Sequence, residues 1–217
     1  MHRAADTKKK SLSYTGHLLT GLCALFFFIA LGLTFVLLFR ALYYFELDYL
    51  NISETSGYSR EEILANYNAL IRWCMPWVQT EFSLPTFPSS PGAIYHFAQV
   101  KSVFRLVWIL GVVGGLALIP LLAAGFRSGK TRFRIAGWTV LVVPALLGLW
   151  AAADFNRAFV LFHELVFRND HWIFDARTDP VILILPEAYF MHCFAVILLI
   201  VAIGAFTLLM LGRRRDL

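Results

Sequence analysis

The stretch GHLLTGLCALFFFIALGLTFVLLF, residues Gly16–Phe39, contains no Asp, Glu, Lys or Arg. A helix of about 20 mostly apolar residues crosses a hydrocarbon core of roughly 30 Å. Three later windows have the same apolar character, namely Val103–Phe126, Ile135–Ala153 and Ala188–Leu211. The sequence therefore predicts an all-α integral membrane protein with four transmembrane helices.

The composition of the whole chain agrees with this class. Its 217 residues are 59% apolar and 15% charged, whereas soluble domains are roughly 45–50% apolar. We expect a single integral membrane domain over residues 1–217. The first window is longer than the roughly 7–15 apolar residues of a signal peptide, so we expect it to be retained as an anchor.

Basic residues predict the orientation in the membrane. Positively charged loops stay in the cytoplasm, which places both termini and the loop between the second and third spans there. The net charge of +5 is then a signal for topology and for membrane lipids, not for nucleic acid. The residues concerned are Arg3, Lys8, Lys9, Lys10, Arg127, Lys130, Arg132, Arg134, Arg213, Arg214 and Arg215.

Two segments outside the spans, about Ala41–Ser102 and about Asp154–Glu187, form a predicted small extracytoplasmic cap. In the first, Ser59 and Glu62 have capping-box spacing and predict the start of a helix. The run FSLPTFPSSPG that follows favours an extended loop because of its prolines. A new helix start at Ser90-Pro91-Gly92 then carries His96 to the outer end of the second span. The helix opened by Ser59 is predicted to place Leu64, Tyr67, Leu70, Ile71 and Cys74 on one face.

The second cap segment continues the helical spacing of the third span. A helix over 135–167 would be roughly 50 Å long, too long for one upright crossing, so its distal part must bend, tilt or project from the bilayer. Asn169-Asp170 predicts a turn. Asp179-Pro180 predicts an N-cap followed by proline at the first helical position. The short apolar run 181–185 is expected to be an interfacial or re-entrant piece.

Histidines carry the strongest chemical signal. His96 and His163 lie near the outer ends of helices in different cap segments, where the fold can bring them together. A pair of imidazoles can act as proton acceptor and donor near neutral pH; a lone interfacial histidine more often only hydrogen-bonds or reaches toward water. His171 and His192 could extend the cluster. The short ligand spacings of metal sites are missing, so no metal is expected.

The remaining polar residues allow several interpretations. Asn169 and Trp172 can donate hydrogen bonds or pack. A nucleophile elbow and a C-x-x-C pair are both missing from the sequence, while a Cys74–Cys193 bridge stays open beside unpaired thiols. Four acidic side chains of the second segment could be general bases, but beside Arg168 and Arg177 they are expected to form a solvated or ion-paired rim. These acids are Glu164, Asp170, Asp175 and Asp179.

The runs HFAQVK, residues 96–101, and FHELVFRNDHWIFDARTDPVILILPEAYF, residues 162–190, resemble the two signature regions of the bacterial lipoprotein intramolecular transacylase family. Gln99 stands where the family pattern has an acid, so a carboxylate that orients a histidine is in doubt. The other departures are Phe97, His171, Ala176 and Leu185. The fitting positions are His96, Val100, Lys101, Phe162, His163, Asn169, Asp170, Trp172, Asp175, Thr178, Asp179 and Pro186.

This resemblance implies a reaction. The sn-2 acyl chain of a diacylglyceryl-cysteine lipoprotein would move to the α-amino group of the same cysteine, without a cofactor. It implies a bacterial cytoplasmic membrane enzyme with its site at the outer leaflet and the diacylated lipoprotein N-terminus as partner. His96 and His163 would be catalytic, with Gln99, Asn169, Asp170 and Trp172 in support. The rival functions are a membrane sensor or assembly module that binds through its cap, and a metal-dependent membrane hydrolase.

Overall fold

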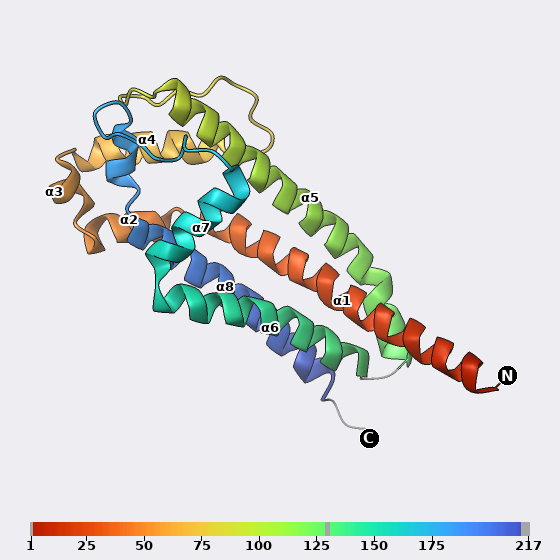
Figure 1. Cartoon of the computed structure of the whole chain (residues 1–217). Helices are drawn as coiled ribbons and strands as arrows, with labels where there is room; N and C mark the ends of the chain where they lie inside the picture. The colour runs from red at the N-terminus through yellow and green to blue at the C-terminus, as the bar shows by residue number, and fades with distance from the viewer. Residues whose placement is uncertain (1, 129–130, 214–217) are drawn as a thin grey trace. The chain divides into compact units, whose positions relative to one another are not determined.

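The computed structural model describes residues 2–128 and 131–213, and the regular secondary structure of this part of the chain is all helical, without a strand (Figure 1). Lys130, Arg214 and Arg215, used above for the orientation, lie outside it. In chain order the elements are α1 His2–Leu38, α2 Ala41–Tyr49, α3 Ile52–Ser56, α4 Arg60–Trp73, α5 Pro91–Ser128, α6 Thr131–Ala153, α7 Phe155–Phe167, the 3₁₀ helix η1 Pro180–Ile184, and α8 Glu187–Leu211.

Four of these helices are long and apolar enough to cross a membrane: Thr15–Leu38, Pro91–Ala124, Phe133–Ala153 and Glu187–Leu211. The prediction of an all-α membrane protein with four spans is confirmed. The helices extend beyond the predicted windows at their N-terminal ends, because α1 begins at His2 and α5 begins at Pro91. His96 therefore lies on the same continuous helix as the second span.

The chain divides into two compact units. The first consists of Met1–Leu33, Val107–Leu149 and Val196–Leu217. Small residues let its helices approach closely, as is usual between membrane helices: a Cβ atom at Gly114 of α5 would lie 2.6 Å from the carbonyl oxygen of Cys23 in α1. Its core draws on all four long helices through Ala24, Leu118, Phe133, Ala136, Val140, Val201, Ala205 and Leu208.

The second unit, Thr34–Leu106 with Trp150–Ala195, is held together by buried tyrosines. Tyr43 of α2 stacks on Tyr67 of α4 with ring centroids 3.6 Å apart. The Tyr43 hydroxyl donates to the carbonyl of Ile184 at the end of η1 (2.6 Å), and the hydroxyls of Tyr67 and Tyr189 are 2.8 Å apart. Elements far apart in sequence are thus joined. Helices α2 and α3 were not predicted from the sequence.

Helix α4 begins where the capping pattern predicts. Ser59 accepts a hydrogen bond from the backbone of Glu62 (3.2 Å), but the Glu62 carboxylate accepts from Thr86 instead of returning to Ser59 (2.9 Å). The predicted apolar face is right at Tyr67, Leu70, Ile71 and Cys74, which are buried. Leu64 is only half-buried, and Ile63, which was not predicted, is buried instead.

That loop is extended, as predicted, and runs from the end of α4 to the start of α5 (Figure 1). Buried Asn66 binds it through the backbone N–H groups of Thr86 and Phe87 (3.2 and 3.3 Å). Lys101 donates to the carbonyl of Val78 (2.6 Å) and lies over the ring of Trp73 at 4.2 Å. The loop is therefore fixed from both α4 and α5.

The predicted break after the third span occurs at Asp154, whose carboxylate accepts the backbone N–H of Arg157 (3.0 Å) and caps α7. Helix α7 buries His163 and Phe167 on one face. Its opposite face is apolar and exposed, with Phe162 at 50% and Leu165 at 64% of their possible surface. The predicted turn at Asn169-Asp170 and the start of η1 at Pro180 are both found.

Candidate active site

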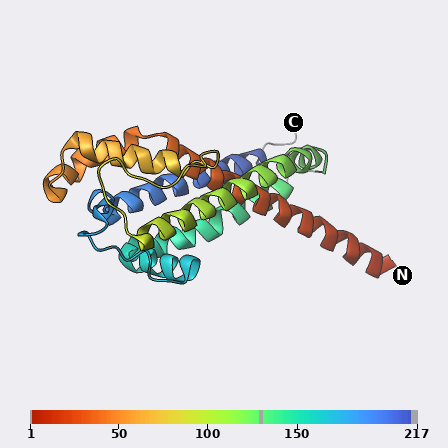
Figure 2. The ribbon, with the colours of Figure 1, turned by 90° about the horizontal axis from the view of Figure 1, so that it is seen from above.

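The structure brings His96 and His163 together within the second unit. His96 lies in the second turn of α5 and His163 near the end of α7, and this end of α7 approaches α5 in Figures 1 and 2. The ring centroids are 5.9 Å apart, and the planes are inclined by 29°. Both side chains are buried, with 6% and 9% of their surface exposed.

A single hydrogen bond fixes the tautomer of His163. Its Nδ1 lies 2.7 Å from the carbonyl oxygen of Phe159, one turn earlier on α7. A carbonyl oxygen only accepts, so Nδ1 carries the proton and Nε2 has a free lone pair. Burial lowers the pKa of His163 below its ordinary value, although the bond to Phe159 opposes this. A neutral imidazole with Nε2 ready to accept a proton results.

His96 is held differently, by packing. Phe167 and Phe174 meet its ring edge-on, with centroids 4.6 and 5.5 Å away. Its Nδ1 is buried and makes no hydrogen bond. The pair therefore sits among aromatic rings, where its interactions with developing charge are stronger than in water.

Trp172 completes this aromatic surround. Its ring centroid is 4.7 Å from that of His163, with the planes inclined by 38°. The indole Nε1 is buried and has no hydrogen-bond partner.

Asn169 has its hydrogen-bonding groups committed to the framework. Its amide nitrogen donates to the carbonyl of Phe167 (2.7 Å) and to Oε1 of Gln99 (3.1 Å). Its oxygen accepts from the backbone of His171 (3.0 Å). The side chain thus links the end of α7 to α5, one turn beyond His96. Gln99 acts through this link, since its hydrogen-bond partner is Asn169 and not a histidine.

Gln99→Glu is expected to leave the reaction rate near that of the wild type. A glutamate oxygen at this position can accept the same hydrogen bond from Asn169 that Gln99 accepts. Initial rates of the purified variant would check this, with Gln99→Leu as the matched change that removes the acceptor and lowers the rate. A large loss in Gln99→Glu would show that the amide has a role of its own.

His171 and His192, which could extend the cluster, have contacts of their own. His171 is exposed, and its ring meets that of Tyr95 edge-on at 5.1 Å. His192 has its Nδ1 2.8 Å from the carboxylate of buried Glu46, close enough for an ion pair but without hydrogen-bond alignment. Within residues 2–128 and 131–213, three or more His, Cys, Asp or Glu side chains never gather in a way that could hold a metal. Cys23, Cys74 and Cys193 are unpaired.

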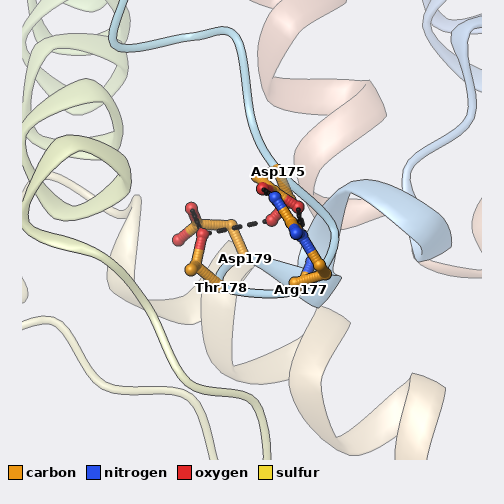
Figure 3. Close-up of polar contacts among 4 residues, drawn as sticks. All are labelled: Asp175, Arg177, Thr178 and Asp179. Carbon is orange, nitrogen blue, oxygen red and sulfur yellow. Dashed lines mark hydrogen bonds and ion pairs between the residues drawn. The ribbon is translucent and has the colours of Figure 1, made fainter.

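The predicted acidic rim is partly right. Glu164 and Asp170 are exposed, and Asp170 contributes only its carbonyl, which accepts from the backbone of Ile173 (3.0 Å). Asp175 pairs with Arg177 in Figure 3 (2.5 Å). This partner lowers the pKa of Asp175 to about 2.

Asp179 was wrongly assigned to the rim, because only 3% of its surface is exposed. One carboxylate oxygen accepts the backbone N–H of Ser90 (2.7 Å), and the other accepts from the Thr178 hydroxyl beside it (2.8 Å; Figure 3). It does not cap η1 through its side chain. Asp179 instead ties the segment that follows His163 to the start of the helix that carries His96. The sequence signal was its place just before a proline in an apolar run.

The comparisons with known proteins agree with this architecture. A family model described as lipoprotein intramolecular transacylase Lit matches residues 18–190. The chain belongs to the lipoprotein intramolecular transacylase family. A solved structure of the membrane integral Lit from Bacillus cereus is 30% identical, with 94% of this chain and 95% of that chain covered and a TM-score of 0.88. No curated protein matches the chain.

Two further structures of the Bacillus cereus Lit, each with one histidine replaced, also match. The variant with arginine has a TM-score of 0.78 and covers 98% of this chain and 96% of that one at 30% identity. The variant with alanine has a TM-score of 0.75 and covers 95% and 94% at 31% identity. As a member of the Lit family, this chain is a membrane-integral acyltransferase.

Proposed function

We propose that this enzyme moves the sn-2 acyl chain of a diacylglyceryl-cysteine lipoprotein to the α-amino group of the same cysteine. The product is an N-acyl, lyso-form lipoprotein. The observation that carries the proposal is the buried pair of His96 and His163, in which Nε2 of His163 keeps a free lone pair. The diacylated lipoprotein N-terminus and the surrounding lipids are the partners, and neither a metal nor a cofactor takes part.

The reaction needs a proton to move from nitrogen to oxygen. The amine attacks the ester carbonyl carbon, the new C–N bond forms, and Nε2 of His163 accepts the amine proton. The C–O bond to glycerol then breaks, and the departing oxygen receives a proton with the help of His96. The pair ends the cycle in its starting protonation state, so one substrate molecule supplies nucleophile, acyl group and leaving group.

An intramolecular reaction suits a site that offers two histidines within a shell of aromatic side chains. Well-oriented intramolecular reactions reach effective molarities of roughly 10⁵–10⁸ M, so the enzyme has mainly to orient the lipid and move protons. General acid–base catalysis contributes about 10²–10⁴-fold. The aromatic rings around the pair, among them Phe159, Phe167 and Trp172, exclude water from the ester.

Expression in cells that make only diacylated lipoprotein tests the proposal. Mass spectrometry of the N-terminal lipopeptide is expected to find one acyl chain on the amino group and a free sn-2 hydroxyl. Unchanged diacyl lipoprotein would favour a sensor or assembly module. Release of free fatty acid that stops on addition of a chelator would favour the metal-dependent hydrolase.

We also propose that both termini lie in the cytoplasm and that the histidine pair faces the outer leaflet. The support is the placement of basic residues at both termini and between the second and third spans. A protease-cleavable tag inserted at Gly57, a residue with positive φ between α3 and α4, should be cut from outside intact spheroplasts. A tag after Leu217 should be protected, and the reverse pattern would refute the orientation.

The pH dependence of kcat/KM follows from the two groups that exchange the proton. The α-amine must be neutral to attack, and its pKa is about 7.7–8.0. The pKa of His163 is lowered by burial, so this imidazole is protonated less than a free histidine is at about pH 6.5. We expect kcat/KM to fall below about pH 8 with unit slope. A second downward bend is expected below the ordinary histidine pKa, and one at or above it would contradict a depressed His163 pKa.

A further inference from the structure

We propose that the indole N–H of Trp172 binds the oxygen of the reacting carbonyl and stabilises the oxyanion that forms there. This inference rests on the proposed transacylation and adds a catalytic residue to it. The observation is a buried donor without a partner, next to a neutral histidine with a free acceptor nitrogen.

The unpaired state of Trp172 Nε1 calls for a physical reason. Buried tryptophan N–H groups usually find a hydrogen-bond partner, and leaving one unsatisfied destabilises the protein. Trp73, on α4, shows the ordinary case, because its Nε1 donates to the carbonyl of Thr80 (2.9 Å). A donor that is left unpaired in the free protein can bind an oxygen of the substrate. The destabilisation caused by the unpaired donor is then relieved when this hydrogen bond forms.

The turn that carries Trp172 is held rigid. The side-chain oxygen of Asn169 accepts the backbone N–H of His171 (3.0 Å), and the carbonyl of Asp170 accepts that of Ile173 (3.0 Å). The indole packs on His163 with ring centroids 4.7 Å apart. An oxyanion donor must be positioned before the reaction to be effective, and these bonds fix the backbone on either side of Trp172.

Three other donors of this turn are already used. The Asn169 amide nitrogen donates to two protein acceptors, the Phe167 carbonyl and Gln99. The backbone N–H groups of His171 and Ile173 close the turn itself. Unlike these donors, the buried Trp172 N–H is not committed to a protein acceptor.

The chemical step is balanced without a further reactant. As the amine nitrogen bonds to the ester carbon, the π electrons of the carbonyl move to its oxygen, and the Trp172 N–H donates to that oxygen while His163 accepts the amine proton. The electrons return when the C–O bond to glycerol breaks. The donor keeps its own proton throughout, so Trp172 stabilises charge and does not act as an acid.

Replacement of Trp172 by 3-benzothienylalanine tests the proposal, since this analogue keeps the size and packing of indole but has sulfur in place of N–H. Loss of one oxyanion-hole donor lowers kcat by about 10²–10³-fold, so we expect a fall of this size with little change in KM. Trp172→Phe should lose a similar amount. The same analogue at Trp73 is the matched control and should leave kcat at the wild-type value.

Each outcome of this experiment decides something. A benzothienylalanine variant with wild-type kcat would overturn the proposal and leave Trp172 a packing residue, as would a loss seen only in KM. Thermal unfolding of each variant separates loss of the donor from loss of the fold, and only variants with wild-type midpoints count. Wild-type enzyme that forms no N-acyl product would instead refute the proposed transacylation, so the two failures are distinct.

Discussion

His163→Ala is expected to lower kcat by about 10²–10⁴-fold, the usual contribution of a general acid–base group. The variant loses the Nε2 lone pair that its bond to the Phe159 carbonyl leaves free, so the amine proton has no acceptor in the buried site. KM should change little, because the acyl chains bind through apolar contacts. Single-turnover rates with a synthetic diacylglyceryl-cysteine peptide, read by mass spectrometry, would measure the effect.

His96→Ala should have a loss of the same order, and the double variant should be little slower than either single one, because groups that act as a unit are not additive. His171→Ala is the matched control: this histidine is nearby in sequence but exposed, and its removal should keep the wild-type rate. Losses that multiply in the double variant would mean that the two histidines contribute independently to the same transition state and not as a unit. Normal lyso-lipoprotein from either single variant would end the proposed mechanism.

Asp179→Ala is expected to destabilise the protein by about 3 kcal/mol, since hydrogen bonds to charged groups contribute about 1.5–3 kcal/mol. The change leaves the backbone N–H of Ser90 and the hydroxyl of Thr178 without their acceptor. For a chain of this size the unfolding midpoint should fall by roughly 6–12 °C. The start of α5 also loses its tie, and a displacement of about 1 Å at a catalytic group can cost about 10²-fold in rate.

Thermal unfolding in detergent and kcat would be measured on the same preparations. Asp175→Ala is the matched control, because Asp175 lies on the same loop but its ion pair with Arg177 is exposed, and it should change neither quantity. Asp179→Asn keeps an acceptor for Ser90 and should fall between the two. An Asp179→Ala protein with wild-type stability and rate would show that the loop holds its position without this carboxylate.

The long helices could be predicted from sequence because membrane spans depend on local composition. The Asp154 break followed from a length argument, and the Ser59 cap from a four-residue pattern. Asp179 was misplaced because its burial depends on Ser90, a residue 89 positions away. The same limit applies to α2, which is built around Tyr43 and its contact with Ile184, 141 positions away. The spacing of apolar residues along the chain carries no information about partners so distant in sequence.

For the candidate site, too, some features could be predicted from the sequence and others could not. His96 and His163 could be chosen from residue type and position, but their approach, the tautomer of His163 and the unpaired N–H of Trp172 are tertiary properties. Asn169 was a candidate hydrogen-bond donor from the sequence. In the structure its amide nitrogen donates to Gln99 and to the Phe167 carbonyl, so the side chain links α7 to α5 instead. A sequence motif does not show which nitrogen of a side chain lacks a hydrogen-bond partner in the folded protein.

Helix α7 has a further consequence for how this enzyme must be handled. The helix that buries His163 presents Phe162 and Leu165 outward, and exposed apolar side chains bind acyl tails or detergent chains wherever these reach them. We therefore expect the choice of lipid or detergent to affect the helix that holds the proposed base. Rates measured in short-chain micelles and in bilayers of different thickness are therefore properties of enzyme and amphiphile together, and kinetic comparisons between variants require a single, fixed lipid environment.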